Sequence, residues 1–304
     1  MNEQGNGRII SLDKIRALAI VLVVLVHVSA GGLEACAVGT PGFAIFQCIN
    51  IMAFTGVSLF VMISGALRLG RDSEPAPVSE RTLRGAAKFI LLYFVWKGVY
   101  LIIDSLRDRV FDPKQFLLDL IGGRAHYHLW YLPLAALLVL VTPILAPAVR
   151  EIKNSILFLV IFFIFGILMP TMKCFDFPFK YLFLDFLSQF EFSFFTGYIG
   201  YFVLGGFLYR MKDRIKYKHK MLLFLAADLS YIIACFAGVK RSVSDGLFYD
   251  GFSTPLAFHT LLLSSSLFLL IIGREREVKP LSVIAKASLG IYLLHPLVLS
   301  LFFK

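Results

Sequence analysis

The chain contains few charged residues for its length. Only 16% of its 304 residues are Asp, Glu, Lys or Arg, whereas 58% are hydrophobic. A soluble domain has roughly 25% charged and about 45–50% apolar residues, so one aqueous core does not account for this composition. The apolar residues also occur in runs as long as a bilayer-spanning helix. The sequence therefore excludes a free-standing soluble enzyme, a disordered chain and a coiled coil, and it predicts a polytopic membrane protein.

Cysteine is scarce as well, with four residues at Cys36, Cys48, Cys174 and Cys235. They form no CxxC pair and have no histidine at ligand spacing, so we expect no metal site. Cys36 and Cys174 both fall in loops that we predict to lie outside. A disulfide or two free thiols would fit there, and we favour the free thiols.

The apolar runs predict an all-α fold, a transmembrane bundle of about nine to ten spans that forms a single domain over residues 1–304. The expected spans are 15–33, 43–67, 86–103, 129–149, 155–170, 194–209, 221–239, 252–272 and 283–303. The stretch 171–195 is aromatic-rich but carries Lys180 and Asp185. We expect an interfacial helix there, with a short re-entrant element as the alternative. The first span is expected to stay in the mature protein, because no convincing cleavage site follows it.

Acidic residues are outnumbered by basic ones, 20 against 30, which gives a formal net charge of +10. In a soluble protein this excess would suggest nucleic acid, but here the basic residues lie between apolar spans, so we expect no nucleic-acid partner. They gather before the first span and in alternate loops, at Arg8 to Arg16, Arg68 to Lys88, Arg150 to Lys153, Arg210 to Lys220 and Arg274 to Lys286. The positive-inside rule then predicts a protein of the cytoplasmic membrane with its N-terminus in the cytoplasm.

One histidine lies deep in the first apolar span. Arg16 and His27 are eleven positions apart, which places them within about 20° of the same helix face and about 16 Å apart along the axis. An ionisable residue at this depth faces the bundle interior or a wet cavity by default. Arg16 as a snorkelling anchor and His27 as a hydrogen-bonded packing residue would give the same pattern, but we interpret the aligned pair as functional.

Polar residues also stand at the second, third and eighth spans. Arg81 and Arg84 share a helix face, and their guanidinium groups suit either the phosphates of an anionic cofactor or anionic lipid. Ser64-Gly65 indicates a close contact between helices. His259 is expected to make a packing hydrogen bond.

Two more histidines stand out in the fourth and last spans. His128 begins the fourth span beside Trp130 and Tyr131, and these two aromatic residues are typical interface anchors. His295 lies inside the last span, where Pro296 frees a backbone carbonyl one turn earlier. The anchor interpretation explains the aromatic residues but not the histidines.

Six motifs in this order resemble the acyltransferase family 3 of multi-pass membrane proteins, over nearly the whole chain. They are Asp13-x-x-Arg16, Arg16-x(10)-His27, Ser64-Gly65, Arg81-x-x-Arg84, His128-x-Trp130-Tyr131-Leu132 and Tyr292-Leu-Leu-His295-Pro296. The resemblance implies an integral membrane O-acyltransferase that moves acetyl from cytoplasmic acetyl-CoA to a hydroxyl of a cell-surface or lipid-linked carbohydrate. By that likeness His27 is the catalytic residue, and Arg16, Arg81 and Arg84 hold the acyl donor.

The resemblance also sets the expected partners. These are acyl-CoA, a glycan or lipid-linked sugar as acceptor, and membrane lipid, and the chain is compatible with a homodimer. The residues expected to bind substrate or support the site are Asp13, His128, Trp130, Tyr131 and His295. Members of the family usually have a tenth helix after the Tyr-Leu-Leu-His-Pro element, so a chain that stops at Lys304 is expected to be a shortened or compact member.

The residues leave the mechanism and one alternative function open. His27 suits either a general base for a sugar hydroxyl or a nucleophile that forms an acyl-imidazole. The alternative is a transporter, flippase or exporter of a polysaccharide or lipid-linked saccharide, and a third class is a non-enzymatic subunit of an envelope assembly. The missing repeat symmetry and the scarcity of acidic residues at the midplane count against transport.

Overall fold

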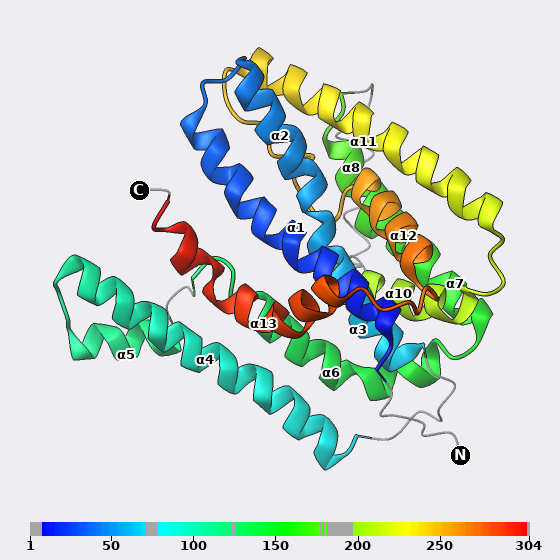
Figure 1. Ribbon diagram of the computed structural model, residues 1–304, viewed down its shortest axis with the longest axis horizontal. Helices are drawn as coiled ribbons and strands as arrows, with labels where there is room; N and C mark the ends of the chain where they lie inside the picture. Colours follow the sequence, from blue (N-terminus) through cyan, green and yellow to red (C-terminus); the bar gives the residue numbers. More distant parts are fainter. Residues whose placement is uncertain are drawn as a thin grey trace. The chain divides into compact units, whose positions relative to one another are not determined.

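The computed structural model describes residues 8–70, 78–122, 126–176, 178, 180 and 197–302, and these form helices and no strand. The all-α prediction is thereby confirmed. The helices (Figure 1) are α1 (Ile10–Ala35), α2 (Pro41–Ala53), α3 (Thr55–Leu69), α4 (Glu80–Asp108), α5 (Pro113–Ile121), α6 (Tyr131–Ala148), α7 (Ile152–Ile161), the π-helical η1 (Phe162–Leu168), α8 (Met169–Lys173), α10 (Ile199–Met211), α11 (Tyr217–Asp245), α12 (Phe258–Ile271) and α13 (Lys279–Leu299). The interfacial helix predicted at 171–195 falls largely outside the described residues.

Seven helical stretches of the described residues are long and apolar enough to cross a membrane. They are Ile10–Ala35, Pro41–Leu69, Glu80–Asp108, Tyr131–Ala148, Ile152–Lys173, Tyr217–Asp245 and Lys279–Leu299. A polytopic helix bundle is thus confirmed. Two of the nine expected spans are shorter than predicted, because α10 has 13 residues and α12 has 14. Helices of that length rise only about 20 Å, whereas the hydrocarbon core is about 30 Å thick.

The predicted span 252–272 begins too early, and its local sequence explains why. Pro255 lacks a backbone N–H and disfavours helix in the residue before it. The chain therefore forms turns there, and α12 begins at Phe258. α12 ends at Ile271, two residues before Gly273, whose φ of 83° lies in the left-handed region that glycine adopts at little cost.

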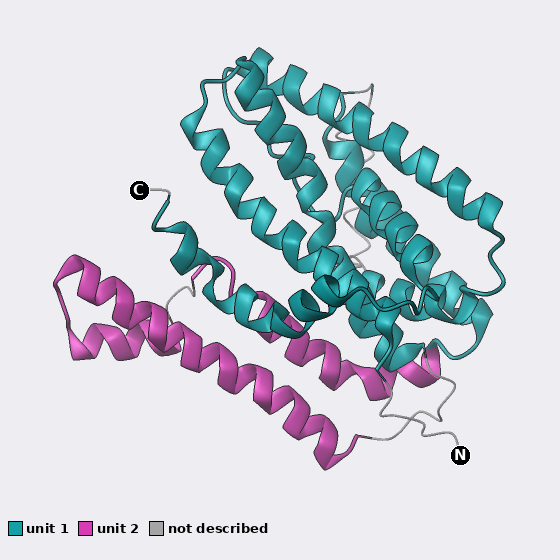
Figure 2. Ribbon diagram, in the orientation of Figure 1, with its two compact units in different colours: residues 1–71, 149–304 teal, residues 72–148 magenta. Residues whose placement is uncertain are grey.

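The helices group into two compact units (Figure 2), each described by itself. Unit 1 comprises residues 1–71 and 149–304, and unit 2 comprises residues 72–148. In unit 1, α1 packs against α2, α3, α12 and α13, while α11 packs against α2 and α12. In unit 2, α4 packs against α5 and α6. The prediction of a single domain over residues 1–304 stays a prediction.

Glycine lets α3 and α10 approach closely in unit 1. A Cβ atom at Gly65 would collide with the backbone of Phe202, and one at Gly205 would collide with the backbone of α3. Ser64, beside Gly65, donates from Oγ to the carbonyl oxygen of Phe60 at 3.2 Å. Backbones come this near only where side chains are small. The close helix contact predicted for Ser64-Gly65 is therefore confirmed.

The basic loops of unit 1 lie close together, as their charge pattern predicts. Lys14 donates from Nζ to the carbonyl oxygen of Arg274 at 2.6 Å, and Arg274 lines one cavity together with Lys212. The start of α1, the α10–α11 loop and the α12–α13 loop thus share one end. At another end the thiol of Cys174 donates to the carbonyl oxygen of Gly251 at 3.2 Å. Which end faces the cytoplasm stays a prediction.

Candidate active site

α1 carries Arg16 and His27 on one unbroken helix. It runs for 26 residues from Ile10 to Ala35 and contains no proline. The rise of about 16 Å expected between the two residues therefore applies, because an uninterrupted α-helix rises about 1.5 Å per residue. Both side chains are half-buried. The helix is confirmed, while the roles assigned to the two residues stay predictions.

Asp13 fixes the guanidinium of Arg16. Arg16 donates from Nη1 to Asp13 Oδ1 at 2.9 Å, and Arg8 donates from Nε to Asp13 Oδ2 at 2.5 Å. Asp13 is buried, and a buried carboxylate is stable only when it is paired in this way. Arg8 also pairs through Nη1 with Glu277 Oε1 at 3.5 Å, so the two guanidinium groups of this cluster are balanced by two carboxylates. The spacing of Asp13 and Arg16 predicts that they share a helix face, and the structure brings them together.

The imidazole of His27 stacks on the imidazole of His295. Their ring centroids are 5.0 Å apart and the rings are inclined by 29°. The contact forms because α1 packs against α13. His295 is only 5% exposed. Two histidines that are far apart in the sequence thus form a pair where α1 meets α13.

Pro296 explains how His295 is held. In an α-helix the N–H of residue 296 would bond to the carbonyl oxygen of Tyr292, but proline has no N–H. His295 Nδ1 lies 2.8 Å from that oxygen and 3.1 Å from the carbonyl oxygen of Ile291. A carbonyl oxygen only accepts hydrogen bonds, so Nδ1 of His295 donates. The bond fixes the tautomer and leaves Nε2 as the acceptor nitrogen of the neutral ring.

A second cluster of polar rings lies in unit 2. His126 Nδ1 and His128 Nδ1 are 3.0 Å apart, so one ring donates and the other accepts. The ring of Tyr100 stacks on His126 with centroids 4.3 Å apart. His128 and Lys97 are each 2% exposed. Sequence reasoning identifies His128 but misses Lys97 and Tyr100, although a lysine inside the apolar run of α4 is a usable signal.

Desolvation sets the protonation of His126, which precedes α6 and lies outside the membrane-spanning segments. Burial lowers the pKa of His126, and the nearby Asp104 opposes that shift only in part. The ring is therefore neutral at pH 7, which agrees with its hydrogen bond to His128. Further along the chain, Trp130 is 41% exposed, and the centroid of its ring lies 6.3 Å from that of the Tyr131 ring. Unit 2 thus offers an exposed aromatic side chain beside the buried His128 and the half-buried His126.

Arg81 and Arg84 lie in the first turns of α4, in unit 2. Both are exposed, and Arg84 forms an ion pair with Glu80. Ser79 caps the helix, its Oγ accepting from the backbone N–H of Thr82 at 3.3 Å. Exposed guanidinium groups are accessible to an anionic ligand. Arg16 and His27 belong to unit 1, so the donor site predicted from all three arginines stays a prediction.

The described residues contain no group of three or more His, Cys, Asp or Glu side chains that could hold a metal ion. The four cysteines are free thiols in the structure. Cys174 is half-buried, and burial raises the pKa of its thiol. A disulfide between Cys36 and Cys174, one of the two readings of the sequence, is therefore not formed here.

A family model described as an acyltransferase domain, that of acyltransferase family 3, matches residues 9–304. The match spans essentially every motif in which the sequence resembles that family. The chain belongs to acyltransferase family 3. Comparisons with curated proteins and with solved structures found no match. Family membership and the seven long apolar helices together make this protein a multi-pass membrane acyltransferase, and the resemblance seen in the sequence is confirmed.

Proposed function

We propose that this acyltransferase moves an acetyl group from cytoplasmic acetyl-CoA to a hydroxyl of a cell-surface or lipid-linked carbohydrate, and that His27 is the catalytic residue. The observation that supports His27 most is its stacking on the buried His295. Ionisable groups are costly at membrane depth and seldom serve packing alone. Imidazole also exchanges a proton near neutral pH, which suits acyl transfer to a hydroxyl.

Two routes satisfy the chemistry. In the first, His27 takes the proton of the acceptor hydroxyl while the hydroxyl oxygen attacks the thioester carbonyl carbon. The carbon–sulfur bond then breaks, and the protonated ring returns the proton to the CoA thiolate. In the second, a nitrogen of His27 attacks the carbonyl carbon and the carbon–sulfur bond breaks to release the CoA thiolate. The acceptor hydroxyl oxygen then attacks the acetyl-imidazole, the carbon–nitrogen bond breaks, and the hydroxyl proton passes to the thiolate. Both routes yield an ester and a thiol, and both begin with an unprotonated His27.

His295 acts in this proposal as a positioning residue. Its bond to the carbonyl oxygen of Tyr292 fixes its own ring, and the fixed ring then restricts the orientation of His27 through stacking. A catalytic group held in its productive orientation avoids an entropic cost at the moment of reaction. The pair therefore separates two tasks, with proton transfer or attack at His27 and orientation at His295.

The donor is held by the arginines in this proposal. Among the described residues, Arg16 bonds to Asp13 through Nη1, and the rest of its planar fork suits a phosphate oxygen. Arg81 and Arg84 supply two further guanidinium groups for the phosphates of acetyl-CoA. The pantetheine arm of acetyl-CoA, extended along α1 over about 16 Å, would then carry the thioester from Arg16 to His27.

The acceptor is assigned to Trp130 and its neighbours in unit 2. Trp130 is 41% exposed, and an exposed indole offers an apolar face to a sugar ring. Tyr131 and the buried His128 add groups that can form hydrogen bonds with hydroxyls.

The test is acetyl transfer by purified full-length protein, supplied with acetyl-CoA labelled in its acetyl group and with lipid-linked sugars, in detergent without any ion gradient. We expect acetyl esters to form with wild-type protein and to be lost with His27→Ala. His219→Ala removes an exposed imidazole from α11 and serves as the matched control, with activity within about twofold of wild type, as expected for an exposed position. Sugar movement that needs a gradient and no acetyl-CoA would instead identify a transporter.

A further inference from the structure

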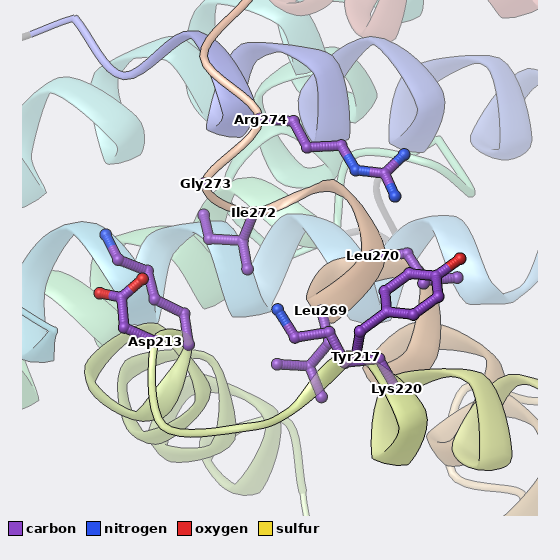
Figure 3. A pocket seen from close by; sticks show the side chains of 9 residues that line it. Asp213, Tyr217, Lys220, Leu269, Leu270, Ile272, Gly273 and Arg274 are labelled. Atoms are coloured by element: carbon purple, nitrogen blue, oxygen red, sulfur yellow. The ribbon is translucent and has the colours of Figure 1, made fainter.

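A basic cavity lies in unit 1 where α10, α11 and α12 end or begin. Its volume is about 230 Å3, several times the roughly 30 Å3 that a water molecule occupies in the liquid. Lys212 comes from the end of α10, Lys220 from the first turn of α11, and Arg274 from the loop after α12. Figure 3 shows Lys220 and Arg274 on different sides of the cavity. With Asp213 as the fourth charged lining residue, the cavity carries a net charge of +2 at neutral pH.

Asp213 offsets only one of the three positive charges that line the cavity. Among the described residues, no ion pair involves Lys212, Lys220 or Arg274. The ammonium of Lys212 lies 4.1 Å from the ring centroid of Tyr209, a contact that orients it without cancelling its charge. The backbone carbonyl of Arg274 accepts from Lys14 at 2.6 Å, which anchors the loop that carries the guanidinium. Three cations from separate elements thus line one space.

The start of α11 adds to the positive potential. Its N-cap residue is Lys216, which provides no side-chain hydrogen bond to the first helical N–H groups. Unsatisfied N–H groups at a helix start favour an anion. Because a phosphate oxygen accepts both such N–H groups and ammonium or guanidinium donors, phosphate suits this cavity better than a carboxylate does.

The remaining lining of the cavity is largely apolar. Leu269, Leu270 and Ile272 form an apolar wall of the cavity. Beyond the cavity, α11 is one of the seven membrane-spanning helices and exposes a run of large apolar side chains. These are Leu222, Leu225, Leu229, Ile232, Ile233 and Phe236, each more than half exposed. A phosphate in the cavity would therefore be continuous with a surface that fits acyl chains.

We infer that this cavity binds the phosphate headgroup of an anionic membrane phospholipid, with the lipid's acyl chains lying along α11. The net charge of +2 favours a headgroup without a compensating ammonium. The cavity does not include His27, so this inference does not depend on the acyl transfer proposed for that residue.

The test is native mass spectrometry of the purified full-length protein in detergent, titrated with dioleoyl phosphatidic acid or with dioleoyl phosphatidylcholine. Lys220→Gln/Arg274→Gln changes the cavity, and Arg214→Gln/Lys218→Gln removes the same two charge types from neighbouring exposed positions outside it. We expect the cavity variant to bind phosphatidic acid about tenfold or more weakly, and the control to stay within about twofold. Wild type should bind phosphatidylcholine more weakly than phosphatidic acid.

Three outcomes would overturn the inference. Equal losses in the cavity variant and in the control would show only diffuse surface charge. Unchanged binding of phosphatidic acid by the cavity variant would remove these residues from the site. Displacement of bound phosphatidic acid by inorganic phosphate or free CoA would assign the cavity to a soluble phosphate instead of a lipid. Thermal unfolding of both double variants checks folding, and all four positions are at the surface.

Discussion

The two units each hold a pair of histidines, and the pairs are built in opposite ways. In unit 1, His27 and His295 come from distant helices and stack face to face, and a backbone carbonyl fixes the tautomer of His295. In unit 2, His126 and His128 are near neighbours in the sequence and share one hydrogen bond between their Nδ1 atoms. The bond in unit 2 joins a nitrogen of each ring, whereas the stacking contact in unit 1 is between the two rings. His27 also lies on the same unbroken helix as Arg16, so we assign the chemistry to the stacked pair and binding or structure to the bonded pair.

The largest expected difference between the pairs is in the rate of acyl transfer. His27→Gln keeps a hydrogen-bonding side chain but cannot take up a proton at neutral pH, so we expect a loss on the order of 10²–10⁴-fold in rate. His126→Gln removes an imidazole from the other pair and should cost far less. Steady-state acetyl transfer by the two purified variants gives the comparison. A larger loss in His126→Gln would move the chemistry to unit 2.

The arginines that we propose to bind acetyl-CoA also differ between the two units. Arg16 is tied to Asp13, whereas Arg81 and Arg84 are exposed. If Arg81 and Arg84 bind the CoA phosphates, replacing either by Ala should weaken CoA binding roughly tenfold or more, because hydrogen bonds to charged groups are strong. Arg107→Ala, at the other end of α4, is the matched control.

Isothermal titration with CoA measures these affinities. Lysine at position 81 or 84 should restore binding only in part, since an ammonium cannot bind phosphate through a planar fork. Unchanged affinity in the Arg81→Ala/Arg84→Ala variant would return both residues to the role of topology anchors.

Pro296→Ala tests the carbonyl bond that distinguishes the unit 1 pair. Alanine restores an N–H that competes with His295 Nδ1 for the carbonyl oxygen of Tyr292. We expect acetyl transfer to fall on the order of tenfold through loss of orientation, while the melting temperature does not fall, because proline is unfavourable inside a helix. A lower melting temperature with unchanged activity would contradict this account of Pro296.

The smallest expected effect is on stability, and it belongs to the unit 2 pair. Burial lowers the pKa of His126 in the folded protein below its ordinary value near 6.5. The unfolded chain then binds more protons than the folded one in acid, so stability falls as the pH drops through the ordinary value. Between pH 7.5 and pH 5.5 the melting temperature of wild type should drop by a few degrees more than that of His126→Gln. Parallel curves for the two proteins would speak against a half-buried His126 with a lowered pKa.

Hydropathy predicted the helices because lipid requires long apolar runs, but it did not predict their interruptions. The expected span 43–67 is two helices, α2 and α3, which meet at Phe54. Phe54 is as apolar as its neighbours, so hydropathy gives no signal there. By contrast, the late start of α12 follows from Pro255, a signal that local sequence does contain.

The sequence predicts those parts of the candidate site that follow from helix geometry or from a local signal. Asp13 and Arg16 are three residues apart on one helix, so their contact follows from helix geometry. Pro296 indicated a free carbonyl, and the structure shows that His295 uses it. The contact between His27 and His295 depends on how α1 packs against α13, and that packing cannot be predicted from a single sequence.

The central claim is that His27 and His295 act as one unit, and a double-mutant cycle on acetyl transfer tests it most directly. The rates of His27→Gln, His295→Gln and the double variant would be measured on protein that still binds CoA. If His295 works only by orienting His27, its loss matters only while His27 is present. The account therefore predicts that the double variant is no slower than His27→Gln alone. Losses that multiply in the double variant would show that the two histidines act independently, and would contradict it.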